Sequence, residues 1–403
     1  MPHSFLTHLE CSVTGERYDA DTVQGRSAAG APLLARYDLD RVRAQVDRDA
    51  LAGRTSSMWR YHELLPVRDP AHITTLGEGG TPLLPLPTHG AAMGLPRLLV
   101  KDEGALPTGS FKARGAAAGV SRARELGVAG VGLPTNGNAG AAWAMYGARA
   151  GIPALIGMPV DAPEICRRQC VAAGAELYLV DGLIQHAGAL VREAVGRRPG
   201  WQDVSTLKEP YRLEGKKTMG YELAQQLGWR VPDVVLYPAG GGVGLIGIHK
   251  ALLEIQALGW IGPDLPRLVA VQSTGCAPVV DAVQRGLDTV VPAQDTATVA
   301  FGINVPAPLG GALMLQAIRQ TEGTAVAVSD EEIVAEVRAV TAAEGVFMCP
   351  EGAACLVAAR RLREEGWLAA EDEVVVLNTG TGLIYPDAVP YSVPTLGRDE
   401  RLP

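Results

Sequence analysis

Excess positive charge, C-x-x-C cysteine pairs and long unbroken apolar runs are all missing from this chain of 403 residues. The formal net charge is −8 at pH 7, which argues against nucleic-acid binding or a membrane-surface role, because both usually need basic patches. The most apolar stretch, residues 234–248, is interrupted by a proline and by glycines and is too short to cross a bilayer. The amino terminus has no basic region followed by an apolar run, as a signal peptide would. The sequence therefore predicts a soluble, cytoplasmic protein that binds neither nucleic acid nor membranes.

The cysteines predict neither a disulfide framework nor a metal centre. Six cysteines are few for a chain of this length. Cys166 and Cys170 would share one face of a helix, but neither a histidine nor a second cysteine pair lies near them in the sequence. Cys11 also stands alone. We expect Cys166 and Cys170 to be packed in the interior, and we expect no metal site.

Strands and helices alternate through most of the chain, and this pattern predicts an α/β fold. Residues 1–70 lack the alternation and are expected to form a lead-in with a small β-unit and a helix, ahead of a main body over residues 71–403. Nearly continuous apolar strands separated by helices are typical of parallel sheets that are covered on both faces. Ligands of such sheets bind at the carboxyl ends of the strands. The first four expected strands of the main body cover residues 97–103, 129–135, 152–159 and 175–182.

A glycine-rich loop follows the expected strand that begins near residue 233. Gly242, Gly244 and Gly247 match the dinucleotide fingerprint G-x-G-x-x-G. That fingerprint needs an acidic residue about 20 positions further on, but the next strand ends in Gln272 and Ser273, so NAD is disfavoured. A tight turn would account for one or two glycines, whereas five between residues 240 and 247 favour backbone amides that hold a phosphate. The predicted phosphate-binding residues are Gly240, Gly241, Gly242, Val243 and Gly244.

Two further loops place amides and hydroxyls at strand ends. Residues 134–142, PTNGNAGAA, contain Asn136 and Asn138, whose side chains could contact a ligand or only stabilise the turn. Thr379 and Thr381 follow the buried run that ends in Asn378, and their hydroxyls are expected to face the ligand. Ordinary loop capping is the alternative for both threonines.

A lysine occupies an unfavourable place in residues 106–115, LPTGSFKARG. A helix is expected to begin at Ser110, so that Lys112 lies in its first turn, where the helix dipole already supplies positive charge. Burial and nearby positive charge lower the pKa of a lysine from its reference value of about 10.4. A neutral lysine amine is a nucleophile toward aldehydes. Lys112 is therefore the candidate catalytic residue.

One ligand would account for all four loops. Pyridoxal phosphate carries an aldehyde for Lys112, a phosphate for the glycine loop, a ring oxygen for Asn138 and a ring nitrogen for Thr379. A hydroxyl beside the ring nitrogen, in place of a carboxylate, leaves the pyridine largely unprotonated. This state suits elimination and replacement reactions better than transamination.

Five segments of the sequence resemble motifs of the fold-type II pyridoxal-phosphate enzymes, the tryptophan synthase beta-like superfamily, and are most similar to those of threonine synthases. The resemblance covers nearly the whole chain and implies two open α/β domains of parallel or mixed sheet, with the cofactor between them. It also implies a smaller α/β subdomain at about residues 115–205, a homodimer, and a degenerate zinc-ribbon-like unit near residues 10–19. The five segments are residues 101–115, 136–140, 209–218, 240–245 and 379–387.

The resemblance implies that Arg212, in the segment EPYRLEGKKT, binds an anionic amino-acid substrate. An ion pair with Glu209 or Glu214 is the alternative for this arginine. Threonine synthases often carry Asn-Ser shortly before this arginine, where the present chain has Thr206 and Leu207, and Ser-Gly-Asn-Thr where it has residues 136–139. Two polar groups that would contact a substrate phosphate are thus apolar here. The additional phosphate contacts that we expect are Lys208 and Thr135.

The resemblance implies a lyase that converts O-phospho-L-homoserine and water to L-threonine and phosphate, with Lys112 taking the Cα proton. A serine or threonine dehydratase, or a β-replacement synthase similar to cysteate synthase, is the alternative, and the altered phosphate contacts favour it. The retained arginine segment argues against a plain dehydratase. A non-catalytic, cofactor-binding protein is a third interpretation, which the intact Lys112 argues against.

Overall fold

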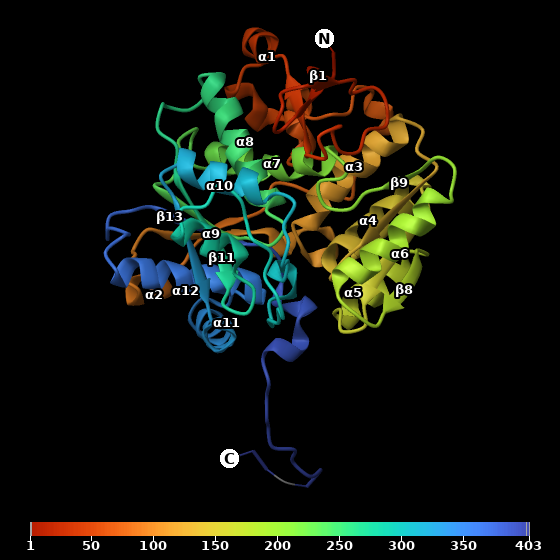
Figure 1. Ribbon diagram of the computed structural model, residues 1–403. Coiled ribbons are helices and arrows are strands. Elements are labelled where there is room, and N and C mark those ends of the chain that lie inside the picture. The colour runs from red at the N-terminus through yellow and green to blue at the C-terminus, as the bar shows by residue number, and fades with distance from the viewer. Residues whose placement is uncertain (1, 400, 403) are drawn as a thin grey trace.

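The computed structural model describes residues 2–399, 401 and 402, which form three sheets and their covering helices (Figure 1). The amino-terminal sheet is antiparallel with the order β2-β1-β3, and helix α1 follows it. The carboxylate of Asp38 caps α1 by accepting a hydrogen bond from the backbone N–H of Arg41. The elements are β1 (Leu6–Cys11), β2 (Arg17–Tyr18), β3 (Leu33–Tyr37) and α1 (Leu39–Gln45).

The largest sheet has six strands in the order β12-β11-β10-β13-β5-β4, and all its pairs are parallel except β4 with β5. Its central strands are fully buried because helices cover both faces: α7, α8 and α10 lie above the sheet and α2, α11 and α12 below it in Figure 1. The strands are β4 (Leu83–Pro85), β5 (Leu98–Asp102), β10 (Val234–Pro238), β11 (Arg267–Ser273), β12 (Thr324–Val328) and β13 (Val374–Asn378). The helices are α2 (Pro87–Ala92), α3 (Lys112–Glu125), α7 (Tyr211–Gln226), α8 (Val243–Ala257), α9 (Pro278–Gln284), α10 (Gly311–Gln320), α11 (Asp330–Glu344) and α12 (Pro350–Glu364).

The third sheet is fully parallel, with the order β8-β7-β6-β9, and lies to one side of the six-stranded sheet (Figure 1). Its strands and helices follow α3 in the chain and precede α7. They are β6 (Gly130–Pro134), α4 (Asn138–Ala150), β7 (Ala154–Pro159), α5 (Glu164–Ala172), β8 (Glu176–Val180), α6 (Ile184–Gly196) and β9 (Trp201–Asp203). The predicted α/β fold class is confirmed, and Cys166 and Cys170 are buried as expected.

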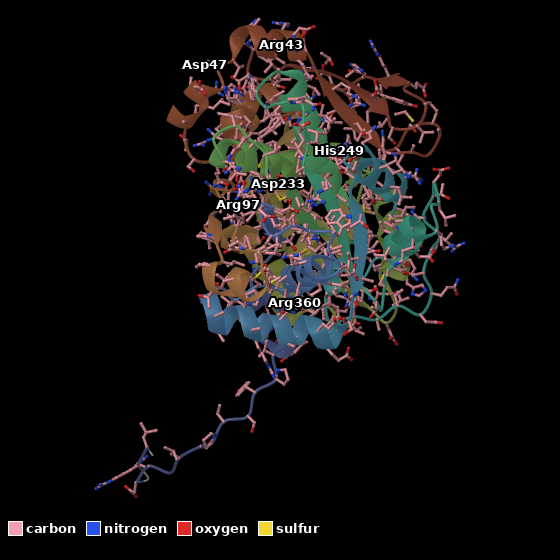
Figure 2. The ribbon with its side chains drawn as sticks, turned by 90° about the vertical axis from the view of Figure 1, so that its left-hand side faces the viewer. Arg43, Asp47, Arg97, Asp233, His249 and Arg360 are labelled. Carbon is pink, nitrogen blue, oxygen red and sulfur yellow. The ribbon has the colours of Figure 1, made fainter. Side chains whose placement is uncertain are left out.

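Charged residues collect at the amino ends of three neighbouring strands of the six-stranded sheet. Arg97, Asp233 and Glu373 directly precede β5, β10 and β13. Arg97 pairs with Glu373 at 2.9 Å, and the carboxylate of Asp233 accepts a hydrogen bond from the N–H of Glu373 at 2.7 Å. Arg97 and Asp233 face the viewer close together in Figure 2. Since the strands are parallel, the loops with candidate site residues lie at the opposite edge of the sheet.

A buried ion network ties helix α3, which begins at Lys112, to helix α7. Arg114 contacts Glu103 at 2.6 Å and Glu222 at 2.7 Å, and Lys101 contacts Glu222 at 2.9 Å. Burial alone would raise the pKa of Glu222, but Arg114 and Lys101 hold it below its usual value. The network therefore fixes the helix that presents the candidate catalytic residue.

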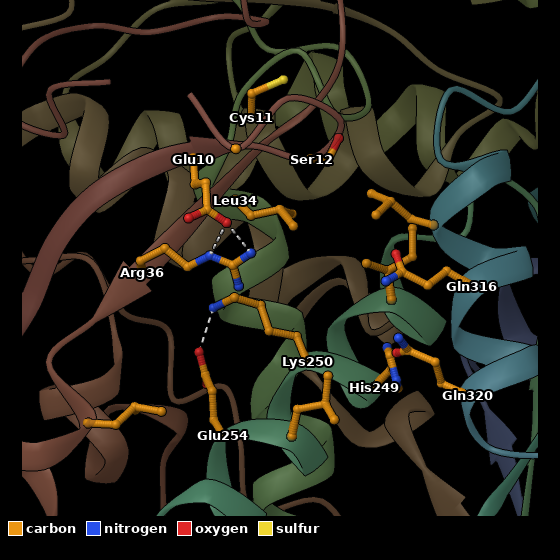
Figure 3. Close-up of a pocket in the computed structure, with 15 residues that line it drawn as sticks. Glu10, Cys11, Ser12, Leu34, Arg36, His249, Lys250, Glu254, Gln316 and Gln320 are labelled. Atoms are coloured by element: carbon orange, nitrogen blue, oxygen red, sulfur yellow. Dashed lines mark hydrogen bonds and ion pairs between the residues drawn. The ribbon is translucent and has the colours of Figure 1, made fainter. Parts of the chain in front are cut away.

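All six lysines of the chain are buried or half-buried. One of them, Lys250, lies in a cavity of about 410 Å³ between the amino-terminal sheet and helices α8 and α10 (Figure 3). There it pairs with Glu254 at 2.7 Å, while Arg36 pairs with Glu10 at 2.6 Å. In the described part of the chain, no helix is both long and apolar enough to cross a membrane.

Candidate active site

The loops after β6, β10 and β13 meet the first turns of α3 and α7 around one cavity of about 390 Å³. This meeting follows from the fold, because these strands are parallel within their sheets and end on the same side. The cavity brings together ten of the eleven predicted site residues. They are Lys112, Thr135, Asn138, Lys208, Arg212, Gly240, Gly241, Gly242, Val243 and Thr379.

Gly244 is the predicted residue that does not line this cavity. A Cβ atom at Gly244 would lie 1.9 Å from the hydroxyl oxygen of Tyr237, so this glycine faces strand β10. Its small size allows α8 to approach that strand closely. The glycine pattern thus combines positions that face the cavity with one that serves helix–strand packing.

Lys112 is the first residue of α3, two positions after the predicted start of that helix. Ser110 is extended, with φ at −157°, and forms a bridge with Gly380 in the loop after β13. Among the described residues, no hydrogen-bond or ion-pair partner of the Lys112 amine is present, and its Nζ lies 4.1 Å from the ring centre of Phe111. Burial chiefly lowers the pKa of Lys112 to about 8, although the carboxylate of Glu351 raises it. A fraction of the amine is therefore neutral and nucleophilic near neutral pH.

The glycine loop presents unused backbone donors to the cavity. Within the described residues, the N–H groups of Gly240 to Val243 donate to no acceptor, and α8 begins directly after Gly242. Gly242 has φ at 79°, a left-handed conformation that favours glycine, and a Cβ there would lie 2.4 Å from Met314. Four free amides at a helix amino terminus fit a phosphate group.

Asn138 is the first residue of α4, at the wall of the cavity. Its Nδ2 donates to the hydroxyl of Tyr385 at 3.0 Å, and its Oδ1 accepts from the thiol of Cys166 at 3.3 Å. Thr135 holds the same loop, because its hydroxyl accepts hydrogen bonds from the N–H groups of Gly137 and Gly140. The amide of Asn138 is thus held in one orientation.

The two threonines after β13 differ in their surroundings. Thr379 lines the cavity, and its carbonyl accepts a hydrogen bond from the N–H of Phe111 at 3.0 Å. The Thr381 hydroxyl instead accepts from the N–H of Leu383, and this residue does not line the cavity. The expectation that both hydroxyls face a ligand is therefore wrong for Thr381, which caps a short helical turn.

The position of Arg212 agrees with both interpretations that the sequence left open, substrate binding and an ion pair with a nearby glutamate. It lines the cavity with a side chain that is 3% exposed, and its Nε lies 3.7 Å from the carboxylate of Glu209. Its Nε–H nevertheless has no hydrogen-bond partner among the described residues. Glu214 pairs with Lys217 instead, at 2.6 Å. The ammonium of Lys208 donates to Asp203 at 2.9 Å, so its charge is already balanced.

Sequence reasoning missed several residues of the cavity wall, and Lys216 and Glu351 are the two that lie closest to the proposed chemistry. Lys216 follows Arg212 by four positions on α7, a spacing that places both on one helix face and could have revealed it. Glu351 is remote from Lys112 in the sequence, and only the fold brings it here. Its Oε1 accepts from the N–H of Gly302 at 2.7 Å and from Tyr385 at 2.8 Å, while its Oε2 is buried without a described partner.

Comparisons with known proteins agree with this geometry. Residues 74–380 match the family described as pyridoxal-phosphate dependent enzyme. The threonine synthase of Methanocaldococcus jannaschii is 35% identical over 94% of this chain and 93% of its own length. The threonine synthase of Methanosarcina acetivorans is 36% identical over 95% of this chain and 94% of its own length.

Solved structures support the fold. Diaminopropionate ammonia lyase from Escherichia coli superposes with a TM-score of 0.66 at 20% identity, covering 79% of this chain and 89% of its own. An L-serine ammonia-lyase from Rhizomucor miehei gives a TM-score of 0.64 at 24% identity, covering 75% of this chain and 93% of its own. The free amides of the glycine loop, the unpaired Lys112 and the oriented Asn138 fit pyridoxal phosphate, and the predicted cofactor is confirmed. The chain belongs to the pyridoxal-phosphate dependent enzymes and, within them, to the threonine synthase family.

Proposed function

We propose that this enzyme is a lyase that converts O-phospho-L-homoserine and water to L-threonine and phosphate. The observation that carries the proposal is the presence of Arg212 in the same cavity as Lys112, with an Nε–H that no described residue satisfies. A buried guanidinium suits the dianionic phosphate of this substrate, and charge-assisted hydrogen bonds are strong. Relatives that bear the name threonine synthase align with almost the whole chain.

Different residues of the cavity have different roles in the proposed reaction. When bound, pyridoxal phosphate withdraws electrons from the substrate and makes its Cα and Cβ protons acidic. The amides of Gly240 to Val243 would hold the cofactor phosphate, while Asn138 and Thr379 would orient its ring. The amine of Lys112 then takes the Cα proton of the substrate, a task that its lowered pKa suits. Loss of a Cβ proton lets the γ-phosphate leave, a proton is added at Cγ, and water adds its hydroxyl at Cβ while a proton returns to Cα. Arg212 holds the leaving phosphate and stabilises its negative charge.

A hydrogen-bonded chain supports the orientation of Asn138. Tyr385 accepts from Asn138 and donates to Glu351, which in turn accepts from the backbone of Gly302. These contacts lock the amide that faces the cofactor ring. The buried carboxylate of Glu351 also favours the protonated form of Lys112, so it stabilises the ammonium that results from proton abstraction.

The product assay separates the proposal from its alternatives. Holoenzyme incubated with O-phospho-L-homoserine is expected to release phosphate and threonine in equal amounts. Ammonia and a 2-oxo acid from serine or threonine, with no phosphate release from O-phospho-L-homoserine, would identify a dehydratase. Turnover of phosphoserine only with an added nucleophile such as sulfite would identify a β-replacement synthase. No turnover of any of these substrates would support a non-catalytic, cofactor-binding role.

The pKa of Lys112 predicts how the apoprotein recombines with its cofactor. Only the neutral amine attacks the aldehyde, and this amine is protonated below its pKa of about 8. The rate of recombination should therefore rise with pH and reach half its maximum near pH 8. Stopped-flow absorbance in the visible region measures this rate. A rate that is flat between pH 7 and pH 9 would contradict the prediction.

A matched ligand serves as the control for this pH profile. Deoxypyridoxine phosphate lacks the aldehyde but retains the phosphate and the ring. Its binding, followed by quenching of protein fluorescence, should depend much less on pH over the same range. If both ligands showed the same pH dependence, the titrating group would be one that contacts the phosphate or the ring, and not Lys112.

We infer further that residues 71–403 form the catalytic body, with residues 115–205 as a smaller subdomain, and that the enzyme is a cytoplasmic homodimer. The match of residues 74–380 to the enzyme family supports the extent of the catalytic body. Light scattering coupled to size exclusion would measure the mass in solution, and a mass of one chain would contradict the dimer.

A further inference from the structure

The six lysines differ in whether a carboxylate balances their charge. Four of them have such a partner within hydrogen-bond distance, as Figure 3 shows for Lys250 and Glu254. The other three pairs are Lys101 with Glu222 at 2.9 Å, Lys208 with Asp203 at 2.9 Å and Lys217 with Glu214 at 2.6 Å. Lys112 and Lys216 have no carboxylate within ion-pair distance among the described residues. The proposed reaction uses Lys112, so the amine of Lys216, which has no carboxylate partner, requires a separate explanation.

Lys216 faces the active-site cavity from helix α7. It is 4% exposed, lines the cavity, and lies one helical turn after Arg212. Its Nζ lies 4.7 Å from the ring centre of Phe111, the same ring that Lys112 contacts. A Cβ atom at Gly115 would lie 3.0 Å from Cε of Lys216, so this glycine of α3 leaves room for the lysine stem. The side chain is thus held between two helices at the cavity wall.

The charges around Lys216 are mostly of the same sign. Burial, Lys112 and Arg212 all lower its pKa well below the usual value, and Glu209 alone opposes them. Without a ligand the protonated form of Lys216 is therefore disfavoured, because its ammonium would be buried without a partner and would lie four residues from the Arg212 cation on the same helix. A dianion that entered the cavity would relieve both costs, because it could accept hydrogen bonds from Arg212 and Lys216 together.

We propose that Lys216 acts with Arg212 to bind a phosphate monoester in the active-site cavity. The four free amides of the glycine loop already fit one phosphate, that of the cofactor, so the pair is expected to hold the phosphate of the substrate. This assignment rests on the proposed function. It also explains how the chain binds a phosphate although Leu207 and Ala139 replace polar residues of the related sequences, and although Lys208 is engaged by Asp203.

The test compares Lys216→Met, which keeps the length of the stem, with Lys216→Arg, which keeps the charge. In the holoenzyme, the methionine variant should show a KM for O-phospho-L-homoserine, and an inhibition constant for inorganic phosphate, that are about 10- to 100-fold higher. The arginine variant should recover most of this loss. The affinity for L-threonine, which lacks the phosphate and shifts the visible spectrum when bound, should change little.

Two further measurements separate the possible outcomes: the affinity of the methionine variant for the cofactor and its analogue, and the release of phosphate by the wild type. If Lys216 instead contacts the cofactor phosphate, the methionine variant will bind pyridoxal phosphate and deoxypyridoxine phosphate more weakly, with inorganic phosphate inhibition of the reloaded enzyme unchanged. If inorganic phosphate, substrate and cofactor all bind the variant as tightly as the wild type, the proposal is wrong. Failure of the wild type to release phosphate from O-phospho-L-homoserine would overturn the proposed function, whereas the binding of inorganic phosphate would still test Lys216.

Discussion

Replacing Lys112 with alanine is expected to lower turnover by about 10³-fold or more, because a positioned general base contributes about 10²- to 10⁴-fold and this amine also engages the aldehyde. Its Nζ has no described polar partner to lose, and Lys112 is only half-buried, so the variant should fold normally. Rates of phosphate and threonine release measure the loss. Cofactor absorbance should show pyridoxal phosphate retained through the glycine loop, but with an altered visible band.

Chemical rescue distinguishes proton transfer from a structural defect. Methylamine added to Lys112→Ala supplies a mobile amine and should restore part of the activity. Lys112→Arg is the matched control, since its guanidinium is not deprotonated and leaves no space for an added amine. An alanine variant whose turnover stays within tenfold of the wild type would exclude Lys112 as the proton carrier.

Replacing Arg114 with methionine is expected to lower the free energy of unfolding by about 3–5 kcal/mol, which is typical when one partner of a buried ion network is removed. Arg114 is fully buried and contacts both Glu103 and Glu222. Lys101 would remain as a partner of Glu222, but among the described residues the Glu103 carboxylate would keep only the hydroxyl of Thr81, at 2.7 Å. Urea denaturation of the apoprotein, followed by circular dichroism, measures the change.

Arg43 provides the control for that substitution. It projects from α1 at the surface, where it pairs with Asp40 at 2.8 Å and donates to the carbonyl of Ala257, with the side chains of the pair 51% and 89% exposed (Figure 2). An exposed pair of this kind contributes at most about 1 kcal/mol, so Arg43→Met should leave the unfolding curve nearly unchanged. Equal losses of unfolding free energy in the two variants would show that the buried network contributes no more to stability than an exposed ion pair does.

The sequence predicted those parts of the fold that depend on local patterns. The strands around Val131, Ile156 and Val235 were evident because runs of apolar residues alternate with helical segments. The start of α3 was misplaced by two residues, because Ser110 pairs with Gly380, a contact that no local pattern reveals.

In the candidate site, too, local patterns predicted some residues, while contacts between distant segments determined the others. Residues after strands, such as Asn138 and Thr379, could each be placed at the carboxyl end of a parallel strand from the alternation of strands and helices, although the two strands belong to different sheets. Gly244 matched the glycine pattern but faces Tyr237, because repeats in the sequence do not distinguish ligand contact from packing. Glu351 and Tyr385 come together only through the packing of α12 against the loop after β13, and no spacing in the sequence indicates this.

The buried or half-buried placement of every lysine has a consequence for proteolysis. An endoprotease that cleaves only after lysine finds no exposed target side chain on the folded molecule, although the chain contains six such sites. Cleavage must therefore wait until strand β5, helix α3, α7 or α8, or the loop before α7, opens. When opening and closing are fast relative to cleavage, the rate of cutting reports the population of the opened form. Lysine-specific digestion would then measure how strongly a bound cofactor closes the helices that surround it.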